Sequence, residues 1–169
     1  MRQAAVLTIS DRGSRGERED KSGSVVREIL REAGFSIVHS EILPDDRSLI
    51  EEELLRLADE SCLDLVVTTG GTGLSPEDVT PDATLAVIHR QVPGMAEAMR
   101  SVSLAKTAHA MLSRAVAGIR GQTLIINLPG SVRGARENLE VVLPALEHAL
   151  DKIQGDPSEC GTDHESGKG

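Results

Sequence analysis

Two kinds of hydrophobic pattern alternate along the chain. Short apolar runs rich in Val, Ile and Leu, such as residues 65–69, are typical of strands buried on both faces. Longer segments with apolar side chains three or four positions apart predict helices with one apolar side. Strands are predicted at residues 4–10, 35–43, 65–69 and 122–128, and helices at about 24–33, 48–58, 81–89, 95–112 and 131–153.

The alternation of strands with helices predicts an α/β fold built as a three-layer sandwich. A mostly parallel central sheet would be connected by right-handed crossovers and covered by helices on both faces. Residues 1–155 are expected to form one domain, because the chain of 169 residues fits a single core. Residues 156–169 contain almost nothing apolar, so we expect a disordered acidic tail there.

Some segments give a weaker signal. Residues 12–23 are polar and contain glycine, which predicts a long loop. Residues 113–121 fit either a short strand and turn or an irregular link. Pro144 is expected to kink or restart the last helix, because proline cannot donate the helical hydrogen bond.

Residues with known preferences mark the predicted helix ends. Thr80 followed by Pro81 reads as a capping hydroxyl and a first helical proline. Ser48 and Glu51 have the spacing of a capping box. Pro93-Gly94 predicts a stop before the next helix.

Polar or glycine-rich segments follow four of the predicted strands. They are Ser10-Asp11, Pro44-Asp45, residues 70–78 and Pro129-Gly130-Ser131. In parallel sheets, ligands bind beyond the carboxyl ends of the strands. We therefore expect these four segments to meet at one rim of the sheet.

The third of these segments carries the strongest functional signal. Its first four residues are Gly70, Gly71, Thr72 and Gly73. Glycines let backbone N–H groups converge on a ligand, because no Cβ intervenes. A tight turn between a strand and a helix would explain the glycines equally well. A turn, however, does not need the carboxylate of Asp78, which lies with Ser75 and Thr80 in the acidic, hydroxyl-rich stretch that follows.

Two kinds of charged partner are suggested near this loop. Ser131 stands at a helix start, where unpaired N–H groups attract anions, although plain helix capping explains it as well. Arg133 would add a positive charge there or would simply be solvated. Asp45 and Asp78 are candidate ligands for Mg²⁺, which prefers carboxylates, waters and phosphate oxygens. Turn and cap chemistry is the alternative for Asp45.

Composition excludes several classes of function. The net charge of −9 disfavours nucleic acid and anionic membranes as partners. The single aromatic residue, Phe35, argues against stacking on single-stranded nucleic acid. Two cysteines, Cys62 and Cys160, form no CxxC motif, and neither a signal peptide nor a membrane-length apolar run is present. We expect a cytoplasmic protein.

Several common site motifs are also missing from the sequence. No GxxxxGK[ST] occurs, and no GxGxxG follows the first strand, which excludes a P-loop and disfavours a dinucleotide-binding Rossmann fold. No pair of serine and histidine stands out as a nucleophile and its base. The five histidines show no metal-ligand spacing and are interpreted as incidental.

The motifs together resemble the molybdopterin adenylyltransferase family, the Mog and MoaB-type proteins of molybdenum cofactor biosynthesis. The resemblance covers about residues 4–153. Its pieces are TISDR at 8–12, DKSG at 20–23, PDD at 44–46, TTGGTG at 68–73, DVTPDAT at 78–84, PGMAEAMR at 93–100, LSRAVAGIRGQTLIINLPGS at 112–131 and ENL at 137–139. The chain is shorter than the multi-domain molybdate-inserting relatives that embed a similar module.

The resemblance implies a reaction and a set of site residues. The reaction is Mg²⁺-dependent transfer of AMP from ATP to the terminal phosphate of molybdopterin, which gives adenylyl-molybdopterin and pyrophosphate. Asp78 and Asp45 are implied to be the critical, metal-binding carboxylates. The residues implied to line the nucleotide and pterin cleft are Ser10, Asp11, Thr69, Gly70, Gly71, Thr72, Gly73, Ser75, Thr80, Ser113, Arg114, Asn127, Pro129, Gly130 and Ser131.

The resemblance also implies homo-oligomers, usually trimers and in some members hexamers, with hand-over of the product to a molybdate-inserting enzyme. Two other hypotheses remain beside adenylyl transfer. One is a MoaB-like module that binds molybdopterin without turnover. The other is a general nucleotide-binding α/β domain with no preference for a pterin.

Overall fold

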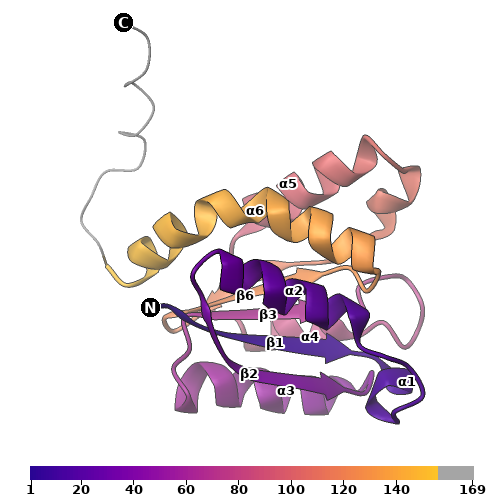
Figure 1. The fold of residues 1–169 in the computed structure, drawn as a ribbon, viewed down its shortest axis with the longest axis horizontal. Helices are drawn as coiled ribbons and strands as arrows, with labels where there is room; N and C mark the ends of the chain where they lie inside the picture. The colour runs from indigo at the N-terminus through magenta and orange to yellow at the C-terminus, as the bar shows by residue number, and fades with distance from the viewer. Residues whose placement is uncertain (156–169) are drawn as a thin grey trace, which may run out of the picture.

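The computed structural model describes residues 1–155, which form a six-stranded sheet between two layers of helices (Figure 1). The strand order is β2-β1-β3-β6-β5-β4. The first four of these are parallel, and they are β1 (Gln3–Ile9), β2 (Ser36–Leu43), β3 (Leu65–Thr69) and β6 (Thr123–Leu128). The last two, β4 (Arg90–Gln91) and β5 (Ala117–Arg120), extend one edge by antiparallel pairing, β5 with β6 and β4 with β5. The predicted α/β fold with a mostly parallel sheet is confirmed.

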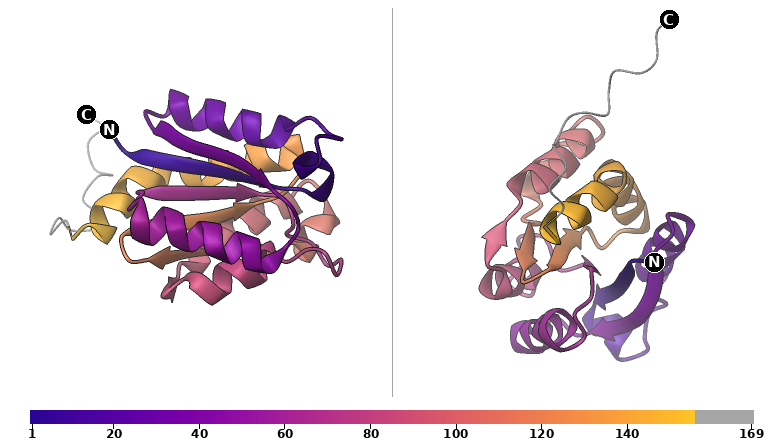
Figure 2. Two further views of the ribbon diagram at one scale, coloured as in Figure 1. Left: turned by 90° about the horizontal axis from the view of Figure 1, so that it is seen from below. Right: turned by 90° about the vertical axis from the view of Figure 1, so that its left-hand side faces the viewer.

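Helices cover both faces of the sheet, as the two further views show (Figure 2). One face carries α2 (Lys21–Glu32), α5 (Pro93–Leu104) and α6 (Val132–Ile153), and α6 packs against both of the others. The other face carries α3 (Arg47–Leu55) and α4 (Thr80–Val87), which pack against each other. A π-helical turn, η1 (Arg56–Glu60), continues α3, and a 3₁₀ turn, η2 (Ala108–Leu112), follows α5.

Two hydrophobic cores lie on either side of the sheet. In β1, Ala4 and Val6 face the core under α2, α5 and α6, whereas Ala5, Leu7 and Ile9 face the core under α3 and α4. Every one of these side chains is buried, because a strand covered on both faces has no polar side. This arrangement explains the uninterrupted apolar run that predicted the strand.

Two predicted helix starts are displaced. The helix expected at about Ser24 begins at Lys21, because the carboxylate of Asp20 caps it by accepting a hydrogen bond from the N–H of Gly23 at 2.8 Å. The predicted loop is further shortened by a helical turn, α1 (Asp11–Ser14). The proposed capping box at Ser48 is wrong, because Asp46 caps α3 instead.

The capping role predicted for Thr80 is also wrong. Thr80 is the first residue of α4, and its hydroxyl donates a hydrogen bond of 2.9 Å to the carbonyl of Gly70. Pro93 does not stop a helix but begins α5, because its missing N–H is not needed in the first turn. The helix expected over residues 95–112 ends at Leu104.

The segment with two interpretations, residues 113–121, contains the short strand β5. A turn at Gly121, with φ of 55°, connects it to β6, so the strand-and-turn interpretation is confirmed. Pro144 lies inside α6 without ending it. The predicted tail, residues 156–169, lies outside the described residues.

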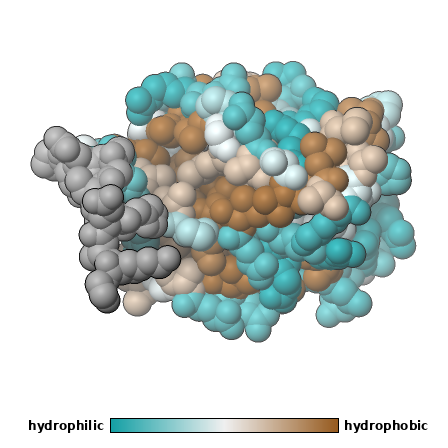
Figure 3. Space-filling view, turned by 90° about the horizontal axis from the view of Figure 1, so that it is seen from above, coloured by the Kyte–Doolittle hydropathy of each residue, from teal (hydrophilic) through white to brown (hydrophobic). Residues whose placement is uncertain are grey.

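The face formed by α2, α5 and α6 is not uniformly polar. Figure 3 shows apolar side chains gathered between polar ones on this face. Val141 and Leu143 of α6 are among the partly buried residues that pack on the core there. No helix within residues 1–155 is long and apolar enough to span a membrane.

Candidate functional site

The carboxyl ends of the parallel strands bring the predicted loops to one rim of the sheet. In the register of the sheet, Thr69 of β3 lies between Thr8 of β1 and Leu128 of β6. The N–H of Gly70 donates to the carbonyl of Leu128 at 3.1 Å, and the N–H of Ser10 donates to the carbonyl of Leu43 at 2.8 Å. The loops after all four strands therefore begin side by side, as the sequence predicted.

Close backbone packing explains why glycine occupies the start of the loop. Gly70 has φ of 99°, and a Cβ there would lie 2.3 Å from the carbonyl oxygen of Ile9. Gly130 packs on the same point, since a Cβ there would lie 3.1 Å from the Cα of Gly70. The two turns that were predicted to bind anions are therefore in direct contact.

Gly71 connects the loop to one of the candidate carboxylates. Its φ is 67°, and a Cβ at this position would lie 2.4 Å from Oγ1 of Thr80 and 3.2 Å from Oδ1 of Asp45. The carbonyl of Gly71 also accepts a hydrogen bond of 3.2 Å from the N–H of Thr80. The loop is thus anchored to the start of α4 with the carboxylate of Asp45 against its backbone.

Asp11 and Asp45 hold each other in place. The N–H of Asp11 donates to Oδ2 of Asp45 at 3.0 Å, and the N–H of Asp45 donates to Oδ1 of Asp11 at 2.8 Å. Burial raises the pKa of Asp45 above its ordinary value, and the charges of Asp11, Asp78 and Glu77 raise it further, against the lowering effect of the Asp11 N–H bond. A divalent cation beside Asp45 would relieve this repulsion.

Asp78 closes the other end of the glycine loop. Its Oδ2 accepts a hydrogen bond of 3.0 Å from the N–H of Ser75, and its own N–H donates to the carbonyl of Ser75 at 2.9 Å. A Cβ on Gly73 would lie 2.8 Å from the same oxygen. The turn therefore does use this carboxylate, which corrects the expectation that a turn has no need of it.

Arg114 fixes the loop from the side. Its Nε donates to the carbonyl of Gly73 at 2.8 Å, its guanidinium also contacts the carbonyl of Asp78, and it pairs with Asp82 at 3.1 Å. The hydrogen bond from Arg114 holds the pKa of Asp82 below its usual range. The structure thus places Arg114 as a brace for the loop that carries Asp78.

Two predicted site residues lie behind the rim. Asn127 is fully buried, and its amide donates to the hydroxyls of Thr68 and Thr84 at 3.0 and 2.9 Å. Thr69 is also buried, and its hydroxyl donates to the carbonyl of Pro129 at 2.8 Å. These side chains position the loops from beneath.

A pocket of about 410 Å³ opens between the glycine loop, α5, η2 and the start of α6. Five of the predicted residues line it, namely Thr72, Gly73, Ser113, Pro129 and Ser131. Arg133, which the sequence pointed to beside Ser131, also lines it, but sequence reasoning missed three other side chains of the same wall, Arg100, Lys106 and His109. Lys106 pairs with Glu137 at 3.0 Å, and Arg100 donates to the carbonyl of Ala115 at 2.8 Å.

A second pocket of about 350 Å³ lies on the other side of the turn formed by Pro129, Gly130 and Ser131. Ser10 and Gly130, both predicted, line it together with Asp20, Lys21 and Ser22, which were not predicted as site residues. The DKSG motif at residues 20–23 was the sequence signal that pointed to them. Pro129 and Ser131 thus face one pocket, while Gly130 faces the other.

The fold and the rim define a class of protein. It is an α/β protein in which glycine turns and a capped helix start offer backbone donors near three aspartates, at the carboxyl ends of the parallel strands. Such donors suit phosphorylated ligands, and the aspartates suit their counter-cation.

Comparison with known proteins identifies the family within this class. Residues 5–148 match the sequence profile described as a probable molybdopterin binding domain, and the chain belongs to that family. It is 48% identical over 152 residues to a protein named molybdopterin adenylyltransferase from Helicobacter pylori, and the aligned region covers 89% of this chain and 86% of that one. A protein of the same name from Escherichia coli K12 is 46% identical over 83% of this chain and 73% of its own length.

A solved structure agrees with the sequence comparisons. The structure described as the molybdopterin biosynthesis enzyme MoaB from Thermus thermophilus is 51% identical and superposes with a TM-score of 0.87. The superposition covers 94% of this chain and all of that one. The family resemblance inferred from the motifs is therefore confirmed.

Proposed function

We propose that this chain transfers AMP from ATP to the terminal phosphate of molybdopterin and so acts in molybdenum cofactor biosynthesis. The observation that carries the proposal is the pair of pockets on opposite sides of the turn at residues 129–132, the first of which is also lined by Thr72 and Gly73 of the glycine loop. Asp45 and Asp78 lie against that loop but line neither of these pockets. Two phosphorylated substrates placed in these pockets would meet at the turn. The relatives named molybdopterin adenylyltransferase support the same reaction.

The reaction needs positioning more than acid–base chemistry. A phosphomonoester has a second pKa of about 6, so its oxygen is already a nucleophile at neutral pH. That oxygen attacks the α-phosphorus of ATP, and the bond from this phosphorus to the oxygen bridging it to the β-phosphate breaks as pyrophosphate leaves. This accounts for a site that is rich in glycine and aspartate.

The residues present fit Mg²⁺. The carboxylates of Asp45 and Asp78 border the glycine loop, Asp11 is bonded to Asp45, and the pKa of Asp45 is raised partly by its acidic neighbours. Asp45 and Asp78 would hold the cation, with Asp11 in support, and the cation would neutralise charge on the phosphates. The N–H groups at the start of α6, which Ser131 caps, and those of residues 71–73 would donate hydrogen bonds to phosphate oxygens.

Further properties follow from membership of the family. We propose that residues 1–155 form one molybdopterin-binding domain, that the protein is a cytoplasmic homotrimer or hexamer, and that its product passes to a molybdate-inserting enzyme. Exposed apolar side chains on α5 and η2, including Leu104 and Met111, support self-association. Light scattering coupled to size exclusion measures the oligomer, and a monomer would contradict this part of the proposal.

Pyrophosphate release tests the proposed reaction. Purified protein supplied with ATP, Mg²⁺ and molybdopterin should release one pyrophosphate per molybdopterin consumed, and omission of the pterin should abolish release. If the protein bound molybdopterin without releasing pyrophosphate, it would be a MoaB-like binding module. If it bound ATP with no preference for a pterin, the third hypothesis would stand instead.

A further inference from the structure

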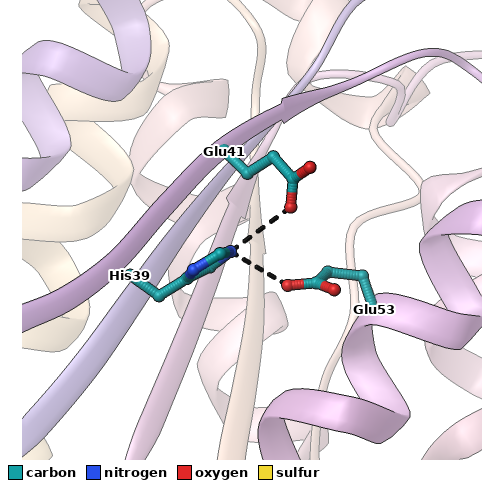
Figure 4. A group of neighbouring side chains, drawn as sticks. All are labelled: His39, Glu41 and Glu53. Atoms are coloured by element: carbon teal, nitrogen blue, oxygen red, sulfur yellow. Dashed lines mark hydrogen bonds and ion pairs between the residues drawn. The ribbon is translucent and has the colours of Figure 1, made fainter.

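A second cluster of ionisable side chains lies away from the rim, between the edge strand β2 and helix α3 (Figure 4). Nε2 of His39 lies 3.3 Å from Oε2 of Glu41 and 2.9 Å from Oε1 of Glu53. One ligand atom from each of the three residues lies within 4.8 Å of the other two. Sequence reasoning interpreted this histidine as incidental, but the fold surrounds its ring nitrogen with two carboxylates.

A β-bulge aims His39 at this cluster. Ala4 pairs with Ile37 and Ala5 pairs with His39, so Val38 is an extra residue in β2. Without it, Ile37 and His39 would lie on the same face of the strand. Instead Ile37 packs on the α2 side, whereas His39 turns toward α3 and Glu53. Bulges re-aim side chains in this way and are rare between parallel strands.

We propose that His39, Glu41 and Glu53 bind a transition-metal cation such as Zn²⁺, with water as the fourth ligand. Ligand bonds of about 2.0–2.2 Å in a tetrahedral site separate the ligand atoms by roughly 3.3–3.6 Å. The separation of Nε2 from Oε2 of Glu41, 3.3 Å, matches this edge length, whereas the 2.9 Å to Oε1 of Glu53 is a hydrogen-bond distance that would lengthen by about 0.4 Å around a cation. An imidazole with two carboxylates suits Zn²⁺ and differs from the all-oxygen ligand set that Mg²⁺ prefers.

The surroundings of the cluster are consistent with a cation. Nε of Arg56 donates to Oε2 of Glu53 at 2.8 Å, which orients that carboxylate as an outer-shell partner does in metal sites. The same guanidinium also donates to Oε1 of Glu53 at 2.5 Å, so a cation would share this oxygen with Arg56. Two carboxylates and one guanidinium leave a net negative charge around the imidazole ring. The Glu53 side chain is only 13% exposed, while that of Glu41 is 45% exposed, so the cluster is enclosed on the Glu53 side and open to solvent on the Glu41 side.

A bound cation would tie β2 to α3. These two elements flank the turn at residues 44–46, which carries Asp45. Binding to the folded state alone raises the unfolding temperature. The site is separate from the proposed reaction, so its test does not depend on catalysis.

Zinc titration of the tag-free, metal-stripped protein tests this site. Isothermal calorimetry should detect zinc binding that persists in excess Mg²⁺, and the unfolding temperature should rise with zinc concentration. Co²⁺ should give the visible absorption of a tetrahedral site. His39→Gln and Glu41→Gln should each weaken zinc binding roughly 10-fold or more, because each removes a direct ligand.

Glu52→Gln is the matched control, because Glu52 is an exposed glutamate on the same helix. It should bind zinc as the wild type does. Equal affinity of His39→Gln and Glu52→Gln, or no zinc binding by the wild type, would overturn the proposal. Circular dichroism checks that each variant is folded. If His39→Gln does not fold, the result for Glu41→Gln decides the test, because Glu41 is exposed and its substitution should leave the fold intact. Loss of pyrophosphate release with zinc binding intact would refute only the proposed function.

Discussion

The rim has an acidic side and a basic side, and the charged side chains of the two sides have different kinds of partner. On the acidic side, Asp11 and Asp45 are held by backbone N–H groups, and the neighbouring charges that raise the pKa of Asp45 are other carboxylates. On the basic side, Lys106 and Arg133 both pair with Glu137, at 3.0 and 2.8 Å. The acidic side therefore concentrates carboxylates without a cationic partner, whereas two cations of the basic side already share a carboxylate.

This difference indicates where the chemistry depends on an added cation. Carboxylates that repel each other in the free protein gain most from a divalent ion. Cationic side chains that are already paired can still steer and position anions, but they gain less free energy when an anion binds. We therefore expect variants of the acidic side to change the rate and the Mg²⁺ dependence, and variants of the basic side to change substrate binding only slightly.

Asp78→Asn should have the largest effect, because it removes a proposed cation ligand next to the reacting phosphates. The rate of pyrophosphate release should fall roughly 100-fold or more, with the fold retained. Asparagine still accepts the hydrogen bond from the N–H of Ser75, so the turn should survive. Glu77→Gln is the control, since Glu77 is an exposed neighbour. A fully active Asp78→Asn enzyme would remove Asp78 from the mechanism.

Asp45→Asn should lower the rate by roughly 10- to 100-fold and change the pH dependence. In the wild type the rate should fall as the pH drops through the raised pKa of Asp45. The folded state holds this proton more tightly than the unfolded state, so ionisation of Asp45 lowers stability as the pH rises through that window. The variant should therefore be at least as stable as wild type at neutral pH, and the difference should shrink in acid.

Thermal unfolding between pH 4 and 8 measures this trend, and Asp46→Asn serves as the control. Asn caps a helix as well as Asp does, so the Asp46 variant should keep both α3 and the activity. An Asp45→Asn variant less stable than wild type at every pH would contradict the charge repulsion assigned to the acidic side.

Gly71→Ala should disturb the acidic side through the backbone. A φ of 67° and a Cβ 2.4 Å from Oγ1 of Thr80 should lower the free energy of unfolding by about 1–3 kcal/mol. Denaturant unfolding measures the loss. Gly94→Ala is the matched control, because a Cβ there meets no atom within 4 Å. Equal stability of the two variants would show that the loop does not need its left-handed residue.

Arg133→Gln should have the smallest effect. Its side chain is 76% exposed and forms a surface pair with Glu137. The KM for ATP should rise by no more than about 5-fold, with kcat unchanged. Steady-state kinetics at low and high salt measure this, and a loss of kcat comparable to that of Asp78→Asn would remove the distinction between the two sides.

The same comparison explains what the sequence could predict. The acidic side comes from loops that follow parallel strands, and parallel strands bring such loops together whatever the details of packing. Glycine, proline and aspartate in those loops carry local signals that can be read one segment at a time. The fold class and the rim were therefore predictable from the order of elements.

The basic side depends on tertiary packing. Arg100 lines the first pocket from α5, and Lys106 lines it from the segment after Leu104, where the predicted helix ends and the chain turns into η2. Thr80 was read as a cap because local propensity cannot show that the carbonyl of Gly70 approaches its hydroxyl. The bulge at Val38 likewise breaks the two-residue period that would assign the face of His39.

Diffraction from crystals of the protein with a non-hydrolysable ATP analogue and Mn²⁺ in place of Mg²⁺ tests the central claim most directly. The anomalous signal should place the cation about 2.1–2.3 Å from carboxylate oxygens of Asp45 or Asp78, with phosphates on the turn at residues 129–131. A cation or phosphates bound away from both the aspartates and this turn would contradict the account.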